Sequence, residues 1–154
     1  MVEEATNIVS YLSQEGIMKA KLVSPLMYRV LDDTLYVEFP NKLHVDFYDD
    51  STKIESWVDA KYGKYFEALN KVYLRDSVVV ISVNGDTLRS HDLWWDQNTQ
   101  KFYTDTIAHY NGPDNQVTGT MGMEATQDLK TVTFKYPNAL MNLNDAGIDN
   151  KPKP

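Results

Sequence analysis

The chain has 154 residues, of which 42% are hydrophobic, and it carries a formal net charge of −7 with no cysteine. This length is typical of one domain that buries most of its apolar side chains. The acidic balance argues against binding to a nucleic-acid backbone, which requires clustered Lys and Arg, and the absence of cysteine excludes disulfides and thiolate chemistry.

The start of the chain lacks the pattern of a signal peptide, because Met1-Val2-Glu3-Glu4 is acidic where a basic segment is expected. No apolar run approaches the roughly 20 residues that cross a bilayer as a helix. Since Met1 directly precedes ordinary domain sequence, we expect that a leader or membrane anchor was cut away before Val2.

The first third of the chain is typical of strands in which apolar and polar residues alternate. Residues 2–13 fit either a helical stripe or a strand, and we favour a strand because Gln14-Glu15-Gly16 is a turn signal. Pro25 is expected to end or bend the second strand. The strands expected here are 2–13, 17–23, 27–31, 35–39 and 43–47.

We expect three strands in the middle of the chain, at 54–62, 72–83 and 87–95, of which 72–83 is the most apolar piece of the chain. Asn84-Gly85 indicates a type I′ hairpin turn, since both residues tolerate positive φ. A change in the phase of alternation near Asp92 predicts a β-bulge. Trp94 and Trp95 are adjacent and must therefore point to opposite faces of their strand.

Three further strands are expected at 102–110, 117–123 and 132–136. Roughly ten strands without helical periodicity predict an all-β fold, with a two-sheet sandwich, a jelly roll or an open solenoid as the candidates. We assign residues 1–140 to a single domain. Residues 141–154 contain few apolar side chains and are expected to form a flexible tail.

Part of the chain repeats itself. Lys71-Val72-Tyr73 recurs as Lys101-Phe102-Tyr103, and the offset is 103 − 73 = 30 residues. A looser third copy aligns residues 123–128 with residues 95–100. Such a period indicates stacked hairpin units that bury their apolar faces together, although hairpins that share turn chemistry would also look alike.

The sequence offers little support for catalysis. His44, His91 and His109 stand alone in separate strands, without metal-ligand spacing. The acidic pairs Asp32-Asp33 and Asp49-Asp50 belong to turns, where carboxylates cap and solubilise. No nucleophile elbow or glycine-rich phosphate loop is present. We therefore expect no enzyme activity, no metal and no cofactor.

The order of motifs in the second half of the chain resembles that of the LptC family. The motifs are Ser77 to Ile81, Asn84-Gly85-Asp86, Thr87 to Ser90, Leu93 to Asp105 and Thr118 to Met123. The segment from Ser77 to Met123 carries the more specific likeness, and a looser one covers about residues 8–136. Gly119 and Gly122 resemble a glycine pair of the family; the alternative is a bulge or a close strand crossing.

The resemblance implies a twisted, partly open β jelly roll of the OstA-like type, built from repeated antiparallel hairpins. It implies a periplasmic protein of outer-membrane biogenesis, anchored to the inner membrane, that receives lipopolysaccharide from the subunits of an inner-membrane ABC transporter. The lipopolysaccharide then passes to another periplasmic jelly-roll protein, which joins by addition of an edge strand. No nucleic acid takes part.

Small and bulky apolar residues are interleaved on the faces that we expect to turn inward. Two sheets lined in this way would leave an apolar trough for acyl chains, to which flexible Met side chains could adapt. The alternative, an ordinary packed core, fits any single residue better. The expected lipid-binding residues are Val58, Ala60, Tyr62, Val78, Val80, Leu88, Trp95, Gly119, Met121, Met123 and Phe134.

Two other functions remain open from the residues alone. One is a carbohydrate-binding β-sandwich module that uses Trp57, Trp94 and Trp95 as stacking platforms. The other is a structural adaptor without a ligand, which predicts a dry interior with no continuous cavity.

Overall fold

A computed structural model describes residues 1–136 and 139–142, and in these ranges it contains a 14-stranded sheet and one short 3-10 helix. The all-β prediction is confirmed. The elements are β1 (Val2–Gln14), β2 (Ile17–Leu31), β3 (Leu35–Phe39), β4 (Leu43–Tyr48), β5 (Ile54–Ala60), β6 (Tyr62–Phe66), η1 (Glu67–Leu69), β7 (Lys71–Ser82), β8 (Thr87–Asp96), β9 (Lys101–Thr104), β10 (Ala108–Asn111), β11 (Gln116–Gly119), β12 (Met123–Thr126), β13 (Val132–Tyr136) and β14 (Ala139–Asn142).

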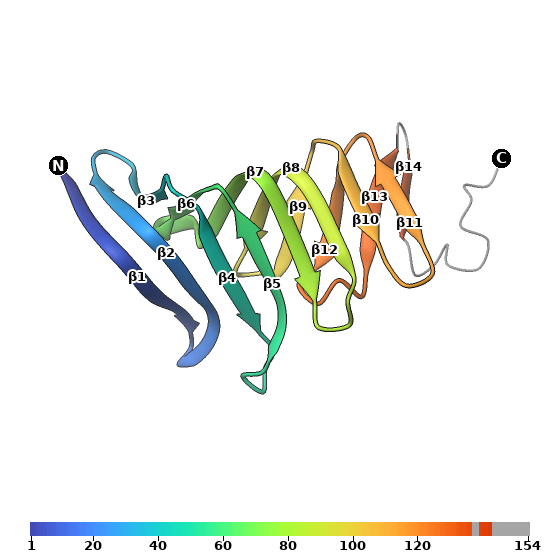
Figure 1. Ribbon diagram of the computed structural model, residues 1–154, viewed down its shortest axis with the longest axis horizontal. Helices are drawn as coiled ribbons and strands as arrows, with labels where there is room; N and C mark the ends of the chain where they lie inside the picture. The colour runs from blue at the N-terminus through green and yellow to red at the C-terminus, as the bar shows by residue number, and fades with distance from the viewer. Residues whose placement is uncertain (137–138, 143–154) are drawn as a thin grey trace.

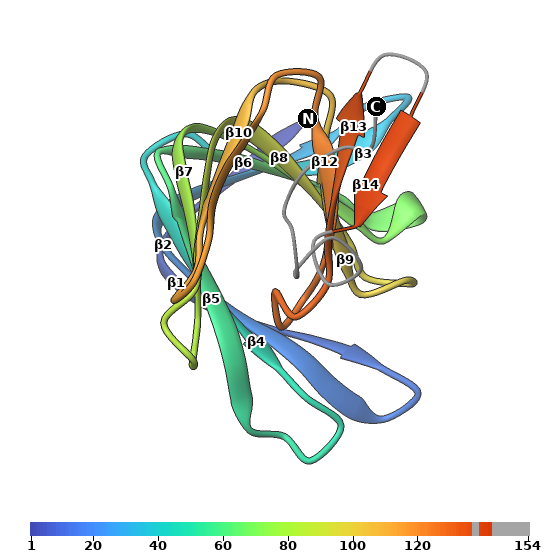
Figure 2. The ribbon, with the colours of Figure 1, turned by 90° about the vertical axis from the view of Figure 1, so that its right-hand side faces the viewer.

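The sheet is antiparallel and folds back on itself, so that it forms two facing halves (Figures 1 and 2). The long strands β1, β2, β7 and β8 run through both halves. The first half has the order β1-β2-β4-β5-β7-β8-β10-β11. The second half has the order β1-β2-β3-β6-β7-β8-β9-β12-β13-β14. This arrangement agrees with the predicted jelly roll.

The long strands change partners where they bend, and we call this line of bends the fold line. In β7, residues 71–75 pair with β6 and residues 79–82 pair with β5. Between these stretches Asp76 and Ser77 have φ values of 67° and 57°. The predicted bulge near Asp92 lies here, with the extra residue on β7 rather than on β8.

Bends at the fold line also divide several predicted strands. The expected strands at 54–62, 102–110 and 117–123 are each two strands in the structure, whereas 17–23 and 27–31 belong to one strand, β2, that bends through Pro25. Between the short strands β11 and β12, Gly122 makes the bend with a φ of 101°. The pair β9 and β10 thus repeats β7, and β11 and β12 repeat β8.

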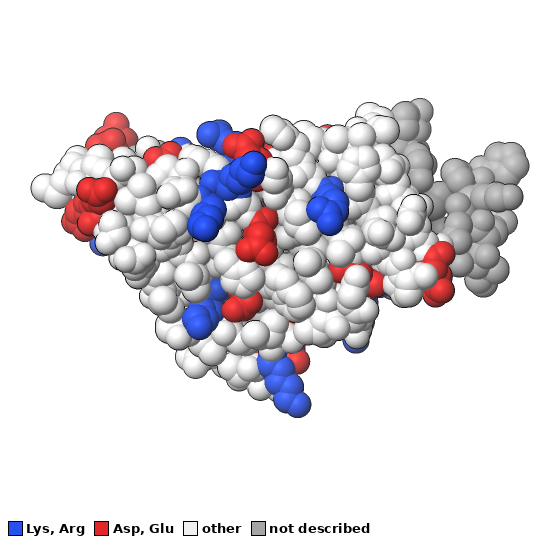
Figure 3. Space-filling view, viewed as in Figure 1, with Lys and Arg blue, Asp and Glu red and all other residues white. Residues whose placement is uncertain are grey.

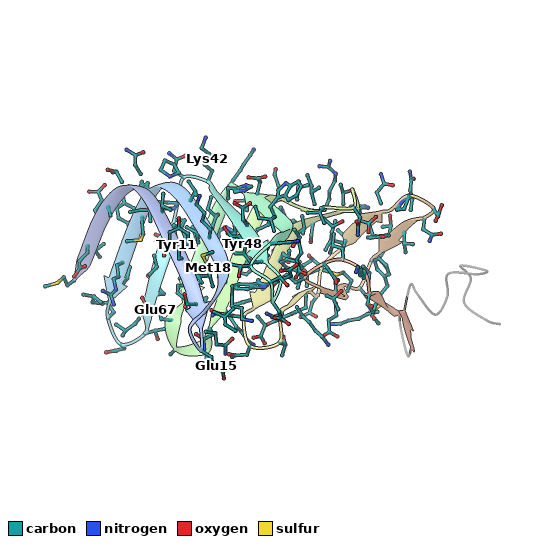
Figure 4. The ribbon with its side chains drawn as sticks, turned by 90° about the horizontal axis from the view of Figure 1, so that it is seen from below. Tyr11, Glu15, Met18, Lys42, Tyr48 and Glu67 are labelled. Atoms are coloured by element: carbon teal, nitrogen blue, oxygen red, sulfur yellow. The ribbon has the colours of Figure 1, made fainter. Side chains whose placement is uncertain are left out.

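The two halves end in two rows of turns on the side away from the fold line. The β1–β2, β4–β5, β7–β8 and β10–β11 turns end the first half, and the β2–β3, β6–β7, β8–β9 and β12–β13 turns end the second. Figure 4 shows Lys42, at the fold line, on the opposite side from Glu15 and Glu67, which lie in the two rows. We call these two rows the free ends.

Apolar side chains from both halves meet in the core. Phe47 of the first half contacts two rings of the second half, with centroid distances of 4.8 Å to Trp95 and 5.1 Å to Phe102. All three side chains are at most 1% exposed. Burial of each such side chain stabilises the fold by about 1.5–3 kcal/mol, so packing across the two halves contributes substantially to stability.

The last strand extends beyond the predicted end of the domain. Met141 and Asn142, which the sequence assigns to the tail, lie in β14 and pair with Phe134 and Thr133 of β13. The alternation of apolar residues that predicts strands is too short here to be recognised. The rest of the expected tail, residues 143–154, lies outside the described residues.

Candidate functional site: the interior between the two halves

Most of the predicted lipid-binding residues face the interior. Val58, Val80 and Leu88 are cross-strand neighbours in the first half, and none is more than 1% exposed. The full set of buried members is Val58, Ala60, Val78, Val80, Leu88, Trp95, Gly119, Met123 and Phe134. The structure therefore brings these residues together as one apolar layer, filled by side chains. Their role in lipid binding stays a prediction.

Tyr62 and Met121 lie elsewhere. Tyr62 is half-buried on the outer face, where its hydroxyl donates to Glu38 at 2.5 Å and the Arg75 guanidinium lies 3.9 Å from its ring centroid. Burial, followed by the hydrogen bond to Glu38, raises the pKa of Tyr62 to about 12. Met121 is 47% exposed. The predicted inward direction is wrong for both, because bends at the fold line reset the alternation of faces.

The interior is less completely covered toward the two ends of the sheet. Leu12, Met27 and Tyr65, from β1, β2 and β6, are only partly buried and pack against the core cluster. Val117 of β11 does the same at the other end. An apolar ligand would therefore meet partly exposed apolar side chains at both ends.

The free ends of the two halves meet through a buried glutamine, Gln127, in the β12–β13 turn. Its Oε1 accepts a hydrogen bond from the Trp95 indole Nε1 at 3.1 Å. Its Nε2 donates to the Tyr48 carbonyl oxygen at 3.1 Å and to Glu55 Oε2 at 2.7 Å. Trp95 belongs to the second half, whereas Tyr48 and Glu55 belong to the first. Gln127, which is 3% exposed, therefore connects the two halves.

A second glutamine makes a similar but weaker connection. Gln97, in the β8–β9 turn and also 3% exposed, donates from Nε2 to the Ser13 carbonyl oxygen of β1 at 3.3 Å. Its Oε1 is buried and has no hydrogen-bond partner among the residues that the structure describes. Beside it, Gln14 Nε2 donates to Asn98 Oδ1 at 3.3 Å. We call these contacts, together with those of Gln127, the seam.

Gln97 and Gln127 occupy equivalent positions in the repeat, since 127 − 97 = 30. Their backbone N–H groups donate to the carbonyl oxygens of Asn70 and Gln100, which are also 30 residues apart and have φ values of 53° and 56°. The sequence alignment of residues 123–128 with 95–100 is therefore wrong by two residues. A constant offset of 30 would have paired the two glutamines before the structure was known.

The seam is acidic as well as polar. Burial raises the pKa of the Glu55 carboxyl against the opposing effect of its hydrogen bond from Gln127. Neighbouring carboxylates raise it further; these are Asp128, Asp49 and Asp50. A hollow of about 250 Å³ opens here, lined by Tyr48, Asp49, Asp50, Glu55, Thr99, Gln100, Thr126, Gln127 and Asp128. Within residues 1–136 and 139–142, no group of three or more His, Cys, Asp or Glu side chains is arranged to hold a metal ion.

The outer face of the second half carries a row of aromatic side chains around Trp94. Its ring centroid lies 4.9 Å from that of Tyr73, 5.8 Å from that of Phe66 and 6.3 Å from that of Tyr103. Trp94 and Trp95 point to opposite faces, as predicted. Trp95 is 1% exposed and so is not available as a stacking platform for a sugar.

Charged side chains are interspersed on the face shown in Figure 3, where Lys and Arg lie among Asp and Glu.

On the outer face of the first half, His44 lies between two carboxylates, with Nε2 2.7 Å from Asp46 Oδ1 and Nδ1 2.8 Å from Asp59 Oδ1. Burial lowers the pKa of His44, but the hydrogen bonds to Asp59 and Asp46 outweigh it and raise the pKa above 6.5. These contacts link β4 and β5.

Comparison with known families identifies a match that covers most of the chain. A family model described as "Lipopolysaccharide-assembly, LptC-related" matches residues 5–136, which include both glutamines of the seam and nearly all of the described chain. A search of curated proteins gives no match. Among the described residues, no helix has the length and apolar character needed to cross a membrane.

Proposed function

Because the chain belongs to the LptC-related family of lipopolysaccharide-assembly proteins, we propose that it is a non-enzymatic carrier whose interior binds lipopolysaccharide acyl chains. The family gives it a role in lipopolysaccharide transport at the cell envelope. One observation carries the finer proposal: an apolar layer lies between two halves that are continuous at the fold line and meet at their free ends through polar contacts.

The energetics favour binding through the acyl chains. Each CH₂ group that leaves water contributes about 0.8 kcal/mol, so a chain of about a dozen such groups contributes roughly 10 kcal/mol before the cost of opening the interior. The net charge of −7 opposes the anionic groups of lipopolysaccharide. We therefore expect the phosphorylated sugars to stay in solvent and the affinity to depend little on salt.

The free strand edges support a place in a bridge of similar domains. Among the described residues, β1 pairs only with β2 along its whole length, and no other described strand covers its outer edge, where a further strand could add. At the opposite end, within residues 1–136 and 139–142, β11 pairs only with β10, and β14 pairs only with β13 (Figure 1). We propose that these edges join the inner-membrane ABC transporter and a second periplasmic jelly-roll protein by strand addition, with the domain held at the periplasmic side of the inner membrane.

Photo-crosslinking from two adjacent valines tests the proposal. Val80 faces the interior and is 0% exposed, whereas Val79 lies next to it on the same strand and faces outward. A small aliphatic residue that carries a diazirine would replace each in turn. Lipopolysaccharide should crosslink to position 80 and not to position 79. Equal yields, or a higher yield at position 79, would refute binding between the halves.

A further inference from the structure

We propose that Gln127, assisted by Gln97, is a latch that controls the sideways entry of acyl chains into the interior. The latch holds the free ends of the two halves together, and the chains enter when it opens. This inference rests on the proposed function, because it assigns the entry route and the controlling residues to that same interior.

Two of the side-chain hydrogen bonds of Gln127 cross to the first half and exist only while the halves are together, whereas the bond from Trp95 lies within the second half. Its side chain uses both amide hydrogens and its carbonyl oxygen. The two bonds to the first half join groups 79 and 72 residues away in the chain. One of them ends on the Glu55 carboxylate at 2.7 Å, and hydrogen bonds to charged groups are the stronger kind. Separation of the free ends would therefore break a specific set of contacts.

The fold line supplies the hinge. Backbone pairing continues through it in the long strands, and the bends contain residues in the left-handed region, among them Asn7, Asp76 and Ser77. At the free ends, by contrast, side chains make the crossing contacts of the seam. The halves can therefore move apart at the free ends while every strand keeps its partners.

The hydrogen bonds of the seam add only a modest margin to the apolar packing between the halves. Water can replace the hydrogen bonds of an amide that becomes exposed, so the net loss for each bond is small. Opening also gives the unpaired Gln97 Oε1 access to water and lets Glu55 move away from Asp128. The apolar contacts that open with the seam, such as Phe47 with Trp95, can be replaced by the acyl chains themselves. Burial of the acyl chains thus offsets most of the free energy that is lost when the two halves separate at the seam.

Pulsed electron paramagnetic resonance with two spin labels measures the opening directly. The chain contains no cysteine, so Ser51→Cys and Lys130→Cys label only the β4–β5 turn of the first half and the β12–β13 turn of the second half, at exposed positions. A control pair, Ser51→Cys with Asn84→Cys, lies within the first half and should keep its distance under all conditions. Each pair is measured without and with lipopolysaccharide.

Gln127→Met keeps the length of the side chain and removes its amide. We expect it to increase the ratio of the long to the short 51–130 distance by roughly tenfold without ligand, since two bonds between the halves are lost. Gln127→Glu sets a second carboxylate against Glu55 and should open the seam further at neutral pH. Gln116→Met, at an exposed position of β11, is the matched control. Unchanged distances in both Gln127 variants would overturn the latch.

Lipopolysaccharide itself should lengthen the 51–130 distance in the parent chain. Binding at position 80 without any change in this distance would overturn the latch and leave the proposed function intact. An absence of crosslinks at position 80 would refute the proposed function, while the ligand-free distances would still test the latch.

A measurement on the unaltered chain avoids the risk that a variant does not fold. The Trp95 indole N–H, which is bonded to Gln127, should exchange with deuterium faster than the backbone amide of Val80, because opening of the seam exposes it without unfolding the sheet. Equal exchange rates would mean that the seam opens only on global unfolding, which would overturn the latch.

Discussion

Replacement of Gly122 by alanine should destabilise the domain through contacts with the backbone. Gly122 makes the bend between β11 and β12 with a φ of 101°. A Cβ atom would overlap the Thr104 carbonyl oxygen and lie 2.8 Å from the Asp105 Cα. Thr104 cannot retreat, because it is paired with Met123 in the adjacent strand. The carbonyl oxygen of Gly122 also accepts a hydrogen bond from the Lys135 backbone N–H at 3.0 Å, which fixes the bend.

Two effects contribute to the expected loss. A non-glycine residue in the left-handed region costs about 1–2 kcal/mol, and overlap with backbone that cannot move adds about 1–3 kcal/mol. The matched control is Gly16→Ala in the β1–β2 turn, where φ is 77° and no heavy atom of the described residues beyond its chain neighbours lies within 4 Å of the new Cβ. Gly16→Ala should therefore be destabilised only by the conformational cost of a non-glycine residue in the left-handed region.

Thermal unfolding followed by circular dichroism separates the two variants. At about 3 °C per kcal/mol for a chain of this length, Gly122→Ala should lower Tm by roughly 6–15 °C and Gly16→Ala by roughly 3–6 °C. Urea unfolding provides the free energies. Equal losses in the two variants would show that the strand crossing at Gly122 tolerates a methyl group, which would refute the steric reasoning.

Three further substitutions test other parts of the fold, each by urea unfolding. His44→Gln should destabilise the domain more at pH 6 than at pH 9, because folding raises the pKa of His44. The contribution of His44 to stability is therefore complete below about pH 6.5 and is lost as pH rises through its pKa in the folded state. Partial exposure keeps the difference below about 1 kcal/mol, and equal losses at both pH values would contradict the reasoning. Ser56→Ala should stabilise by about 1 kcal/mol, since the Ser56 hydroxyl is buried and has no partner in the described part of the chain; a loss would reveal a hydrogen bond. Phe47→Ala should cost about 3–5 kcal/mol, and a loss below 1 kcal/mol would show that the two halves do not depend on its ring contacts.

The alternation of apolar residues predicts most of the interior correctly. Val58, Val80 and Leu88 lie on straight parts of their strands, where successive side chains point to opposite faces without interruption. The same reasoning fails for Tyr62, which follows a bend at the fold line, and for Met121, which lies within one beside Gly122. A bend that resets the phase by one residue moves a side chain to the other face, and the local pattern that indicated the bulge near Asp92 was not recognised at these two bends.

The seam shows a different limit. Gln97 and Gln127 look like ordinary turn residues in the sequence, and the repeat could have paired them, but neither has a visible reason to be buried. Their burial depends on the Ser13, Tyr48 and Glu55 groups of the opposite half. Contacts between residues more than 70 positions apart depend on how the sheet twists and folds, which a local pattern does not contain.

By itself, the sequence determined the all-β class, the repeated hairpins, most of the apolar layer and the family, because these depend on alternation, turn residues and motif order, all of which are local. The tertiary structure decided that one sheet folds into two halves, that bends turn Tyr62 and Met121 outward, and that two glutamines connect the free ends. These features depend on which strands face one another, and that follows from the accumulated twist and packing of the whole sheet.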